Sequence, residues 1–112
     1  MIQVFGTKKC NETKKAQRFF KERGLKYQFV DLNEKEISKG EFRSVCQAVG
    51  GIDNMINENA KDKDTLELIK YIASEDKEEK LLLNQQLLKT PLVRNGKEAS
   101  VGYAIDKWKM WV

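Results

Sequence analysis

Hydrophobic and polar positions in the first third of the chain predict a β-α-β unit. Residues 2–5 (IQVF) form a short β-prone run, and from residue 11 to residue 23 apolar side chains recur at helical spacing. Gly24 lies where a glycine just past a helix end is expected. Residues 25–32 (LKYQFVDL) alternate in part between apolar and polar positions and are rich in strand formers. Two strands joined by a helix in this way pair in parallel, with a right-handed crossover.

The middle of the chain, about residues 34–88, has helical patterns. Ser38 can cap a helix, and Glu41, three residues later, completes a capping box. Apolar residues then share one face until two consecutive glycines end the helix. Three further segments follow, a short helix or irregular turn (the pattern does not decide) and then two helices, at residues 52–60, 64–74 and 78–88.

The last quarter of the chain returns to strand and turn signals. The only proline, Pro91, precedes a predicted β-hairpin over residues 92–101, whose Asn-Gly pair is the strongest two-residue turn signal in the sequence. A short closing helix is predicted over residues 103–112. The order β-α-β, helical insertion, β-β-α predicts an α/β protein with a thioredoxin-like fold. We expect one domain over residues 1–112, with a four-stranded mixed sheet flanked by helices.

The composition excludes several classes of site. With 40% hydrophobic and 34% charged residues, and no apolar stretch near the ~18 residues that span a bilayer, we expect a cytoplasmic monomer that contacts no membrane. The net charge of +4 comes without a basic stripe interleaved with aromatics, so direct binding of nucleic acid is not expected. The chain has no histidine, which rules out a Ser-His-Asp or Cys-His pair. Two cysteines are too few for a Cys-only zinc site, so we expect no metal.

Cys10 lies in the first strand-to-helix loop, at the start of the predicted helix. Unpaired N–H groups and the positive end of the helix dipole favour thiolate there and lower the pKa of the thiol. We expect Lys8, Lys9 and Lys14 to act in the same direction, and Thr13, one helical turn on, can donate its hydroxyl to the sulfur. The alternative is a small inert residue under the helix end, but the polar and charged neighbours favour a reactive thiol.

The second cysteine, Cys46, falls on the apolar face of a predicted helix, beside Val45 and Val49. A free cysteine in such a position is usually buried and chemically quiet. The alternative is a resolving cysteine that closes a disulfide with Cys10. That disulfide requires Cα atoms within roughly 7 Å of each other, a distance that the sequence does not give.

Two stretches together resemble the arsenate reductase/Spx family. Residues 10–16 (CNETKKA) resemble the active-site loop of that family. Residues 87–93 (LLKTPLV), followed by the hairpin and by residues 101–103 (VGY), resemble its C-terminal signature. The resemblance covers nearly the whole chain, including the helical insertion. It implies a thioredoxin fold, Cys10 as the reactive thiol and a cis peptide bond before Pro91.

The sequence also departs from the family pattern at the places where arsenate reductases carry arginine. These arginines cradle the oxyanion, but here Thr90 stands before the proline, and residues 54–59 and 102–103 contain no arginine. Lys89 and Arg94 flank the proline without occupying the lost positions. Since the site lacks guanidinium forks for bidentate contacts, we expect poor arsenate reduction.

The expected function is that of an arsenate reductase-like thiol oxidoreductase. Its Cys10 would attack disulfides or mixed disulfides, with glutathione or another low-molecular-weight thiol as co-substrate and no bound cofactor. Glutaredoxin or thioredoxin would be a protein partner. Two residues are expected to be catalytic and six to bind substrate, namely Cys10 and Thr13, and Lys8, Lys9, Lys89, Thr90, Pro91 and Arg94.

An Spx-like regulator that docks on the RNA polymerase α subunit is the alternative. Gly50, Gly51 and the adjacent helices would then form the contact surface. Spx-type proteins usually carry a Cys-x-x-Cys pair, and in this sequence the second place is Thr13. This departure makes the oxidoreductase the favoured interpretation.

Overall fold

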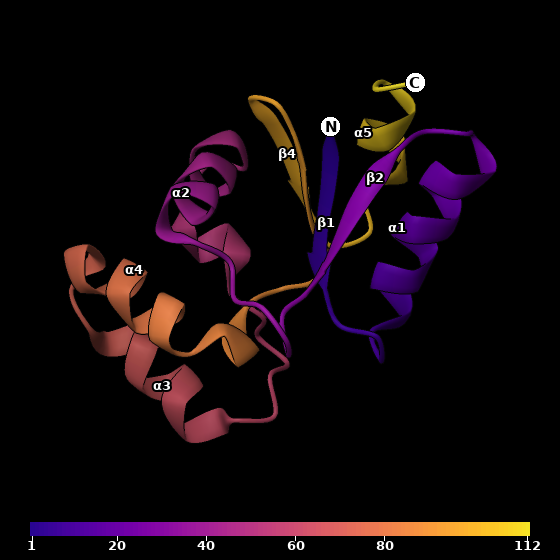
Figure 1. Ribbon diagram of the computed structural model, residues 1–112. Helices are drawn as coiled ribbons and strands as arrows, with labels where there is room; N and C mark the ends of the chain where they lie inside the picture. Colours follow the sequence, from indigo (N-terminus) through magenta and orange to yellow (C-terminus); the bar gives the residue numbers. More distant parts are fainter.

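The computed structural model describes all 112 residues and contains a four-stranded sheet between two helical layers (Figure 1). The strand order is β2-β1-β3-β4. β1 (Ile2–Gly6) pairs in parallel with β2 (Tyr27–Asp31) and antiparallel with β3 (Leu92–Asn95), and β3 pairs antiparallel with β4 (Glu98–Val101). α1 (Asn11–Glu22) connects β1 to β2. The α/β thioredoxin-like fold predicted from the sequence is confirmed.

One face of the sheet is covered by α1 and α5 (Ile105–Lys109). Ile2 and Val4 alternate along β1 toward this face, where they pack with Phe20 and Trp108 in a cluster of seven buried residues. The Trp108 ring nitrogen donates a hydrogen bond to the Ser100 hydroxyl at 2.8 Å, which holds α5 against β4. No helix of the chain is long and apolar enough to cross a membrane.

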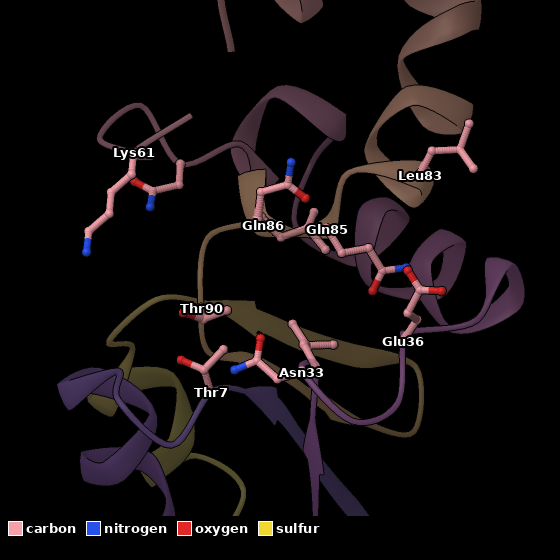
Figure 2. Close-up of a pocket in the computed structure, with 11 residues that line it drawn as sticks. Thr7, Asn33, Glu36, Lys61, Leu83, Gln85, Gln86 and Thr90 are labelled. Atoms are coloured by element: carbon pink, nitrogen blue, oxygen red, sulfur yellow. The ribbon is translucent and has the colours of Figure 1, made fainter. Parts of the chain in front are cut away.

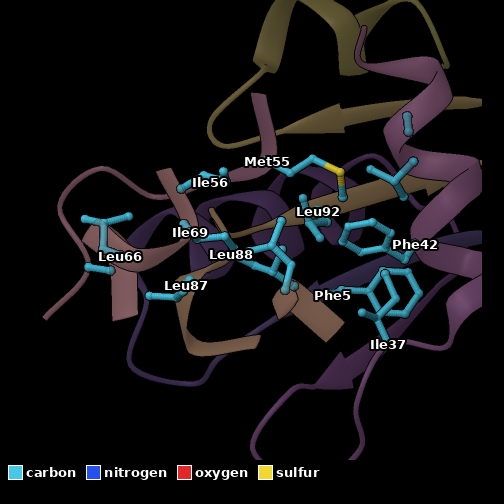
Figure 3. Close-up of a cluster of buried hydrophobic side chains, with 14 of the residues drawn as sticks. Phe5, Ile37, Phe42, Met55, Ile56, Leu66, Ile69, Leu87, Leu88 and Leu92 are labelled. Atoms are coloured by element: carbon cyan, nitrogen blue, oxygen red, sulfur yellow. The ribbon is translucent and has the colours of Figure 1, made fainter. Parts of the chain in front are cut away.

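The helical insertion covers the other face. Phe5 and Leu92 of the sheet join a cluster of 15 buried residues, and Figure 3 shows them beside Phe42 and Met55 of the insertion. The insertion consists of three α-helices and two 3₁₀ helices: α2 (Lys39–Ala48), η1 (Ile52–Met55), α3 (Lys63–Tyr71), α4 (Ser74–Leu83) and η2 (Gln85–Leu87).

Several local predictions are confirmed. Ser38 Oγ accepts from the backbone N–H of Glu41 at 3.2 Å, and Glu41 Oε1 accepts from the N–H of Ser38 at 3.0 Å, so the capping box is formed. The hairpin forms as predicted, with Gly96 at a positive φ of 62° in its turn. The undecided segment over residues 52–60 begins with η1.

Three predicted helices have different limits in the structure. α3 spans Lys63–Tyr71, whereas residues 64–74 were expected to be helical. α4 begins at Ser74 and ends at Leu83, whereas residues 78–88 were expected to be helical. Asn84 ends this helix because its backbone has a non-helical φ of −136°, and its Nδ2 donates back to the Lys80 carbonyl at 2.9 Å. The closing helix spans α5 alone and is shorter than residues 103–112.

A short backbone pairing ties the insertion to the strand that follows it. An isolated antiparallel bridge joins Ile56 to Leu88, and two backbone hydrogen bonds of 2.8 Å flank it. The second of these paired segments leads directly into Thr90 and Pro91. The insertion thereby fixes the course of the chain immediately before β3.

Candidate functional site

Cys10 immediately precedes α1, in the loop that follows β1. Its backbone is extended, with φ −77° and ψ 117°. Its N–H donates to the Thr7 carbonyl at 3.2 Å, and its own carbonyl accepts the first helical bond from Lys14 at 3.1 Å. The half-buried sulfur therefore lies at the start of the helix, where the sequence placed it.

Thr90 contacts this sulfur from a position 80 residues further along the chain. Its Oγ1 donates a hydrogen bond to Cys10 Sγ at 3.2 Å, and its carbonyl oxygen lies 3.8 Å from the same sulfur. The peptide bond between Thr90 and Pro91 is cis. These contacts suit both forms of the thiol, because the carbonyl accepts from S–H and the hydroxyl donates to thiolate.

The pKa of Cys10 is lower than that of an ordinary thiol. Burial of the sulfur acts against this and raises the pKa. It is outweighed by the side-chain hydroxyls of Thr13 and Thr90 and by the backbone N–H groups of Thr13 and Glu12. The first turn of α1 and the segment before β3 thus stabilise the thiolate together.

The two hydroxyls differ in geometry. Thr13 is fully buried against Gly6, since a Cβ added to that glycine would lie 2.3 Å from Thr13 Oγ1. In this position the Thr13 hydroxyl has no partner that meets hydrogen-bond geometry, whereas Thr90 donates at 3.2 Å. Thr90 therefore makes the better-formed bond to the sulfur, and the Thr13 hydroxyl, which was expected to donate to it, lowers the pKa of Cys10 without a well-formed bond.

No lysine is among the main causes of the lowered pKa of Cys10, which are hydrogen bonds instead of the expected lysines. Lys8 Nζ is directed to carboxylates, 4.0 Å from Asp31 and 3.7 Å from Glu34. Lys9 is exposed and makes no ion pair. Neither side chain is therefore placed as a partner of the sulfur.

The two basic residues that flank the proline also lie outside the immediate surroundings of the sulfur. Lys89 is exposed, and its backbone N–H donates to the Met55 carbonyl at 2.8 Å. Arg94 pairs with Gln3 in the sheet, and its guanidinium donates to Gln3 Oε1 at 2.9 Å and to Ser44 Oγ at 3.2 Å. The structure brings Thr13 and Thr90 to Cys10, and it directs Arg94 toward α2.

Cys46 is half-buried at the edge of the large core cluster, so the predicted burial is only partly correct. Phe42 and Val45 are the residues of α2 that are fully covered. Burial raises the pKa of Cys46, and the nearby charge of Glu78 raises it further. Both cysteines are free thiols in the structure.

A cavity of about 700 Å³ opens between the thiol loop and the insertion. Figure 2 shows Thr7, Thr90 and Asn33 on one wall, with Lys61 and Gln86 on the opposite one. Eleven residues line it: Thr7, Leu32, Asn33, Glu36, Asn57, Lys61, Leu83, Gln85, Gln86, Leu88 and Thr90.

This lining is rich in amides and hydroxyls and contains no arginine; its one cation is Lys61. Apart from Thr90, sequence reasoning missed these residues, because they come from four separate segments that only the fold brings together. The chain contains no group of three or more His, Cys, Asp or Glu residues placed to hold a metal ion. The chemistry of the site therefore rests on the sulfur, hydroxyls, amides, the Lys61 ammonium group and the Glu36 carboxylate.

The fold and this site can be compared with known proteins. The YFFB protein is 26% identical, with a TM-score of 0.83 over 98% of this chain and 97% of that chain. SACOL0876 from Staphylococcus aureus COL is 24% identical, with a TM-score of 0.79 over 98% and 97% of the two chains. An arsenate reductase from Vibrio cholerae is 15% identical, with a TM-score of 0.84 over 99% and 97%. No curated protein matches the sequence significantly. The model of the ArsC family matches residues 5–110, and the chain therefore belongs to the ArsC family.

Proposed function

We propose that the protein is a thiol oxidoreductase in which Cys10 alone exchanges with disulfides or mixed disulfides. Membership of the ArsC family supports thiol chemistry. The observation that carries the proposal is the hydrogen bond from Thr90 Oγ1 to Cys10 Sγ at 3.2 Å, together with the lowered pKa of that thiol. Thiolate is the attacking species in disulfide exchange, so a group that stabilises it at neutral pH increases the reactive fraction.

In the proposed reaction the Cys10 thiolate attacks one sulfur of the substrate disulfide. A new S–S bond forms to Cys10, and the other substrate sulfur leaves as a thiolate. Glutathione or another low-molecular-weight thiol then attacks the mixed disulfide and releases Cys10. Glutaredoxin or thioredoxin would perform the same step as a protein reductant.

The cavity beside Thr90 supports a small peptide-like thiol as co-substrate. Its volume of about 700 Å³ lies within the usual range for small-molecule sites. Thr7, Asn33, Asn57 and Gln86 supply hydroxyl and amide groups that match the donors and acceptors of a peptide. Thr90 both lines the cavity and bonds Cys10, so a thiol held there would lie next to the residue that contacts the reactive sulfur.

Arsenate is a poor substrate in this proposal. An oxyanion is best held by guanidinium groups that make bidentate, charge-assisted hydrogen bonds. The cavity offers one lysine, Lys61, and Arg94 is directed to Gln3 and Ser44. An arsenate ion beside Cys10 would thus lack the bidentate guanidinium contacts that bind an oxyanion tightly.

The alternative, an Spx-like regulator that binds the RNA polymerase α subunit, has less support. Gly50 and Gly51, at positive φ of 91° and 130°, form the turn after α2 that would be its contact surface. Thr13 replaces the second cysteine of the Spx motif and is fully buried. A pull-down with purified polymerase α subunit, beside a thiol-transfer assay, distinguishes the two functions.

The direct test is thiol transfer between glutathione and hydroxyethyl disulfide. We expect activity to persist in Cys46→Ser and to vanish in Cys10→Ser. When the disulfide is supplied without glutathione, mass spectrometry should find the mixed disulfide on Cys10. Turnover that survives in Cys10→Ser would rule out the proposed mechanism.

A further inference from the structure

The net charge of +4 conceals an uneven distribution along the chain. Residues 7–26, which comprise the thiol loop, α1 and its end, contain eight Lys or Arg and two Glu. The rest of the chain contains 13 basic and 15 acidic residues. In the fold, α1 lies on one side of the sheet and the insertion on the other (Figure 1). The segment that carries Cys10 is thus the cationic side of the molecule.

The cations of α1 differ from those of the insertion in their partners. Within residues 7–26 only Lys8 forms an ion pair. Seven other cations are exposed and pair with no carboxylate: Lys9, Lys14, Lys15, Arg18, Lys21, Arg23 and Lys26. In the insertion, residues 34–88, three of eight cations are paired at 2.6 to 3.0 Å, namely Arg43 with Glu78, Lys70 with Glu58 and Lys77 with Asp53.

Three of these unpaired cations form a row that begins at the reactive sulfur. Lys14, Arg18 and Lys21 are spaced by one helical turn each and share one side of α1. Cys10 is the residue before the helix, and its carbonyl accepts from the N–H of Lys14 at 3.1 Å. At about 1.5 Å per residue, the row extends about 16 Å from Cys10 to Lys21. We call these three residues the α1 cationic face.

The aromatic side chains near α1 contact two other cations, Lys15 and Arg23, and not the three residues of the α1 cationic face. Lys15 Nζ lies 5.4 Å from the centre of the Tyr103 ring, and the Arg23 guanidinium lies 3.8 Å from the centre of the Phe19 ring. These contacts hold the flanking cations in place without neutralising them. The two acidic residues of the segment, Glu12 and Glu22, lie at the two ends of α1. Glu22 is one turn beyond Arg18 and next to Lys21, so the part of the row nearest Cys10, Lys14 and Arg18, is the most strongly positive.

We propose that the α1 cationic face docks an acidic segment of a protein substrate beside the disulfide that Cys10 attacks. This inference rests on the proposed function. Charge complementarity over the face raises the encounter rate and aligns the partner with its disulfide at the N-terminal end of α1. The Cys10 thiolate attacks one sulfur of that disulfide, a new S–S bond forms, and the other sulfur leaves as a thiolate. The thiol at the end of the row favours a protein partner over nucleic acid, which contains no disulfide.

The test uses synthetic peptides in which one cysteine is activated as a mixed disulfide with thiopyridine. One peptide carries four glutamates beside the cysteine and the other carries four lysines. Release of thiopyridone, followed by absorbance, measures the rate of attack by Cys10 in a Cys46→Ser background. At low ionic strength we expect the acidic peptide to react about tenfold faster or more than the basic one, and the ratio to fall with added salt.

Matched double variants locate the effect. We expect Lys14→Glu/Arg18→Glu to abolish or reverse the preference, whereas Lys63→Glu/Lys97→Glu, with the same change in net charge, keeps most of it. Dithiodipyridine, a neutral reagent, reports the intrinsic reactivity of Cys10 in every variant, and rates are expressed relative to it. Circular dichroism verifies that each variant is folded.

The outcomes separate this inference from the proposed function. If Cys10 fails to react with dithiodipyridine and with both peptides, the proposed function and this inference fall together. If Cys10 reacts well with all three reagents but without charge preference, only the docking inference is overturned. A salt-sensitive dimer in sedimentation, lost in Lys14→Glu/Arg18→Glu, would assign the face to the acidic insertion of a second copy and would also overturn it.

Discussion

Replacing Thr90 by valine removes one hydrogen-bond donor from the Cys10 sulfur and nearly preserves side-chain volume and β-branching. In the structure Thr90 Oγ1 donates to Cys10 Sγ at 3.2 Å. A hydrogen bond to a charged group contributes about 1.5–3 kcal/mol. The sulfur is half-buried, so the lower end of that range applies. Since one pKa unit corresponds to about 1.4 kcal/mol, Thr90→Val should raise the pKa of Cys10 by about one unit.

The assay is the pH dependence of alkylation by iodoacetamide in a Cys46→Ser background. The parent should titrate below the ~8.5 of a free cysteine. Thr90→Val should titrate about one unit higher, and at a pH below both values its alkylation should be about tenfold slower. Thr7→Val is the matched control, because Thr7 lies in the same loop as Cys10 and its hydroxyl makes no hydrogen bond to the sulfur. An unchanged pKa in Thr90→Val, or an equal shift in Thr7→Val, would refute the assignment of Thr90 as the donor.

Four further predictions follow from the same contacts. Cys46, half-buried and with a raised pKa, should be alkylated much more slowly than Cys10 at neutral pH, and mass spectrometry that finds equal labelling would contradict this. Gly6→Ala should lower the free energy of unfolding, measured in urea, by about 1–3 kcal/mol, because the new Cβ would clash with Thr13. Adding Thr13→Ala should recover part of this loss. A double variant as unstable as Gly6→Ala alone would disprove the clash. Because the pKa of Cys10 is lowered in the folded state, its contribution to stability is present above the pKa of the unfolded thiol and is lost as the pH falls through the folded pKa. The unfolding free energy of the parent should therefore rise relative to that of Cys10→Ser as the pH increases from the lowered folded pKa to the pKa of the unfolded thiol, and parallel curves would contradict this. Arsenate with glutathione and glutaredoxin should support very slow NADPH oxidation, since each lost charged hydrogen bond costs about 1.5–3 kcal/mol; rapid turnover that depends on Cys10 would mean that Lys61 or another cation forms an oxyanion site.

Local signals in the sequence were sufficient where one short segment determines its own conformation. The capping box of Ser38 and Glu41 and the Asn-Gly hairpin both involve contacts within three or four residues, and both formed as predicted. The position of Cys10 at the start of α1 followed in the same way from a strand, a glycine and a helical pattern.

The errors arose where the local pattern is weak or where distant segments decide the outcome. The predicted limits of α4 were wrong because its mixed charges give little periodicity. Its end also depends on the hydrogen bond from Asn84 Nδ2 to the Lys80 carbonyl. The facing of Arg94 depends on the register of β3 against β1, which no local pattern gives. The bond from Thr90 to Cys10 spans 80 residues, so the sequence could suggest that the two segments meet but not which hydroxyl reaches the sulfur.

The backbone bridge between Ile56 and Leu88 has a consequence for any attempt to make a smaller version of this protein. Joining the end of β2 to Lys89 would keep the four strands, α1, Thr90 and Pro91, and it would give a minimal thioredoxin-like scaffold. It would also remove Met55, whose carbonyl accepts from the N–H of Lys89 and anchors the residue before Thr90. Thr90, whose hydroxyl stabilises the thiolate, would then lie in a loop that no backbone hydrogen bond to the insertion holds in place. The insertion therefore positions Thr90 relative to the reactive sulfur. A deletion that keeps every residue near Cys10 would still make the position of the Thr90 hydroxyl less defined.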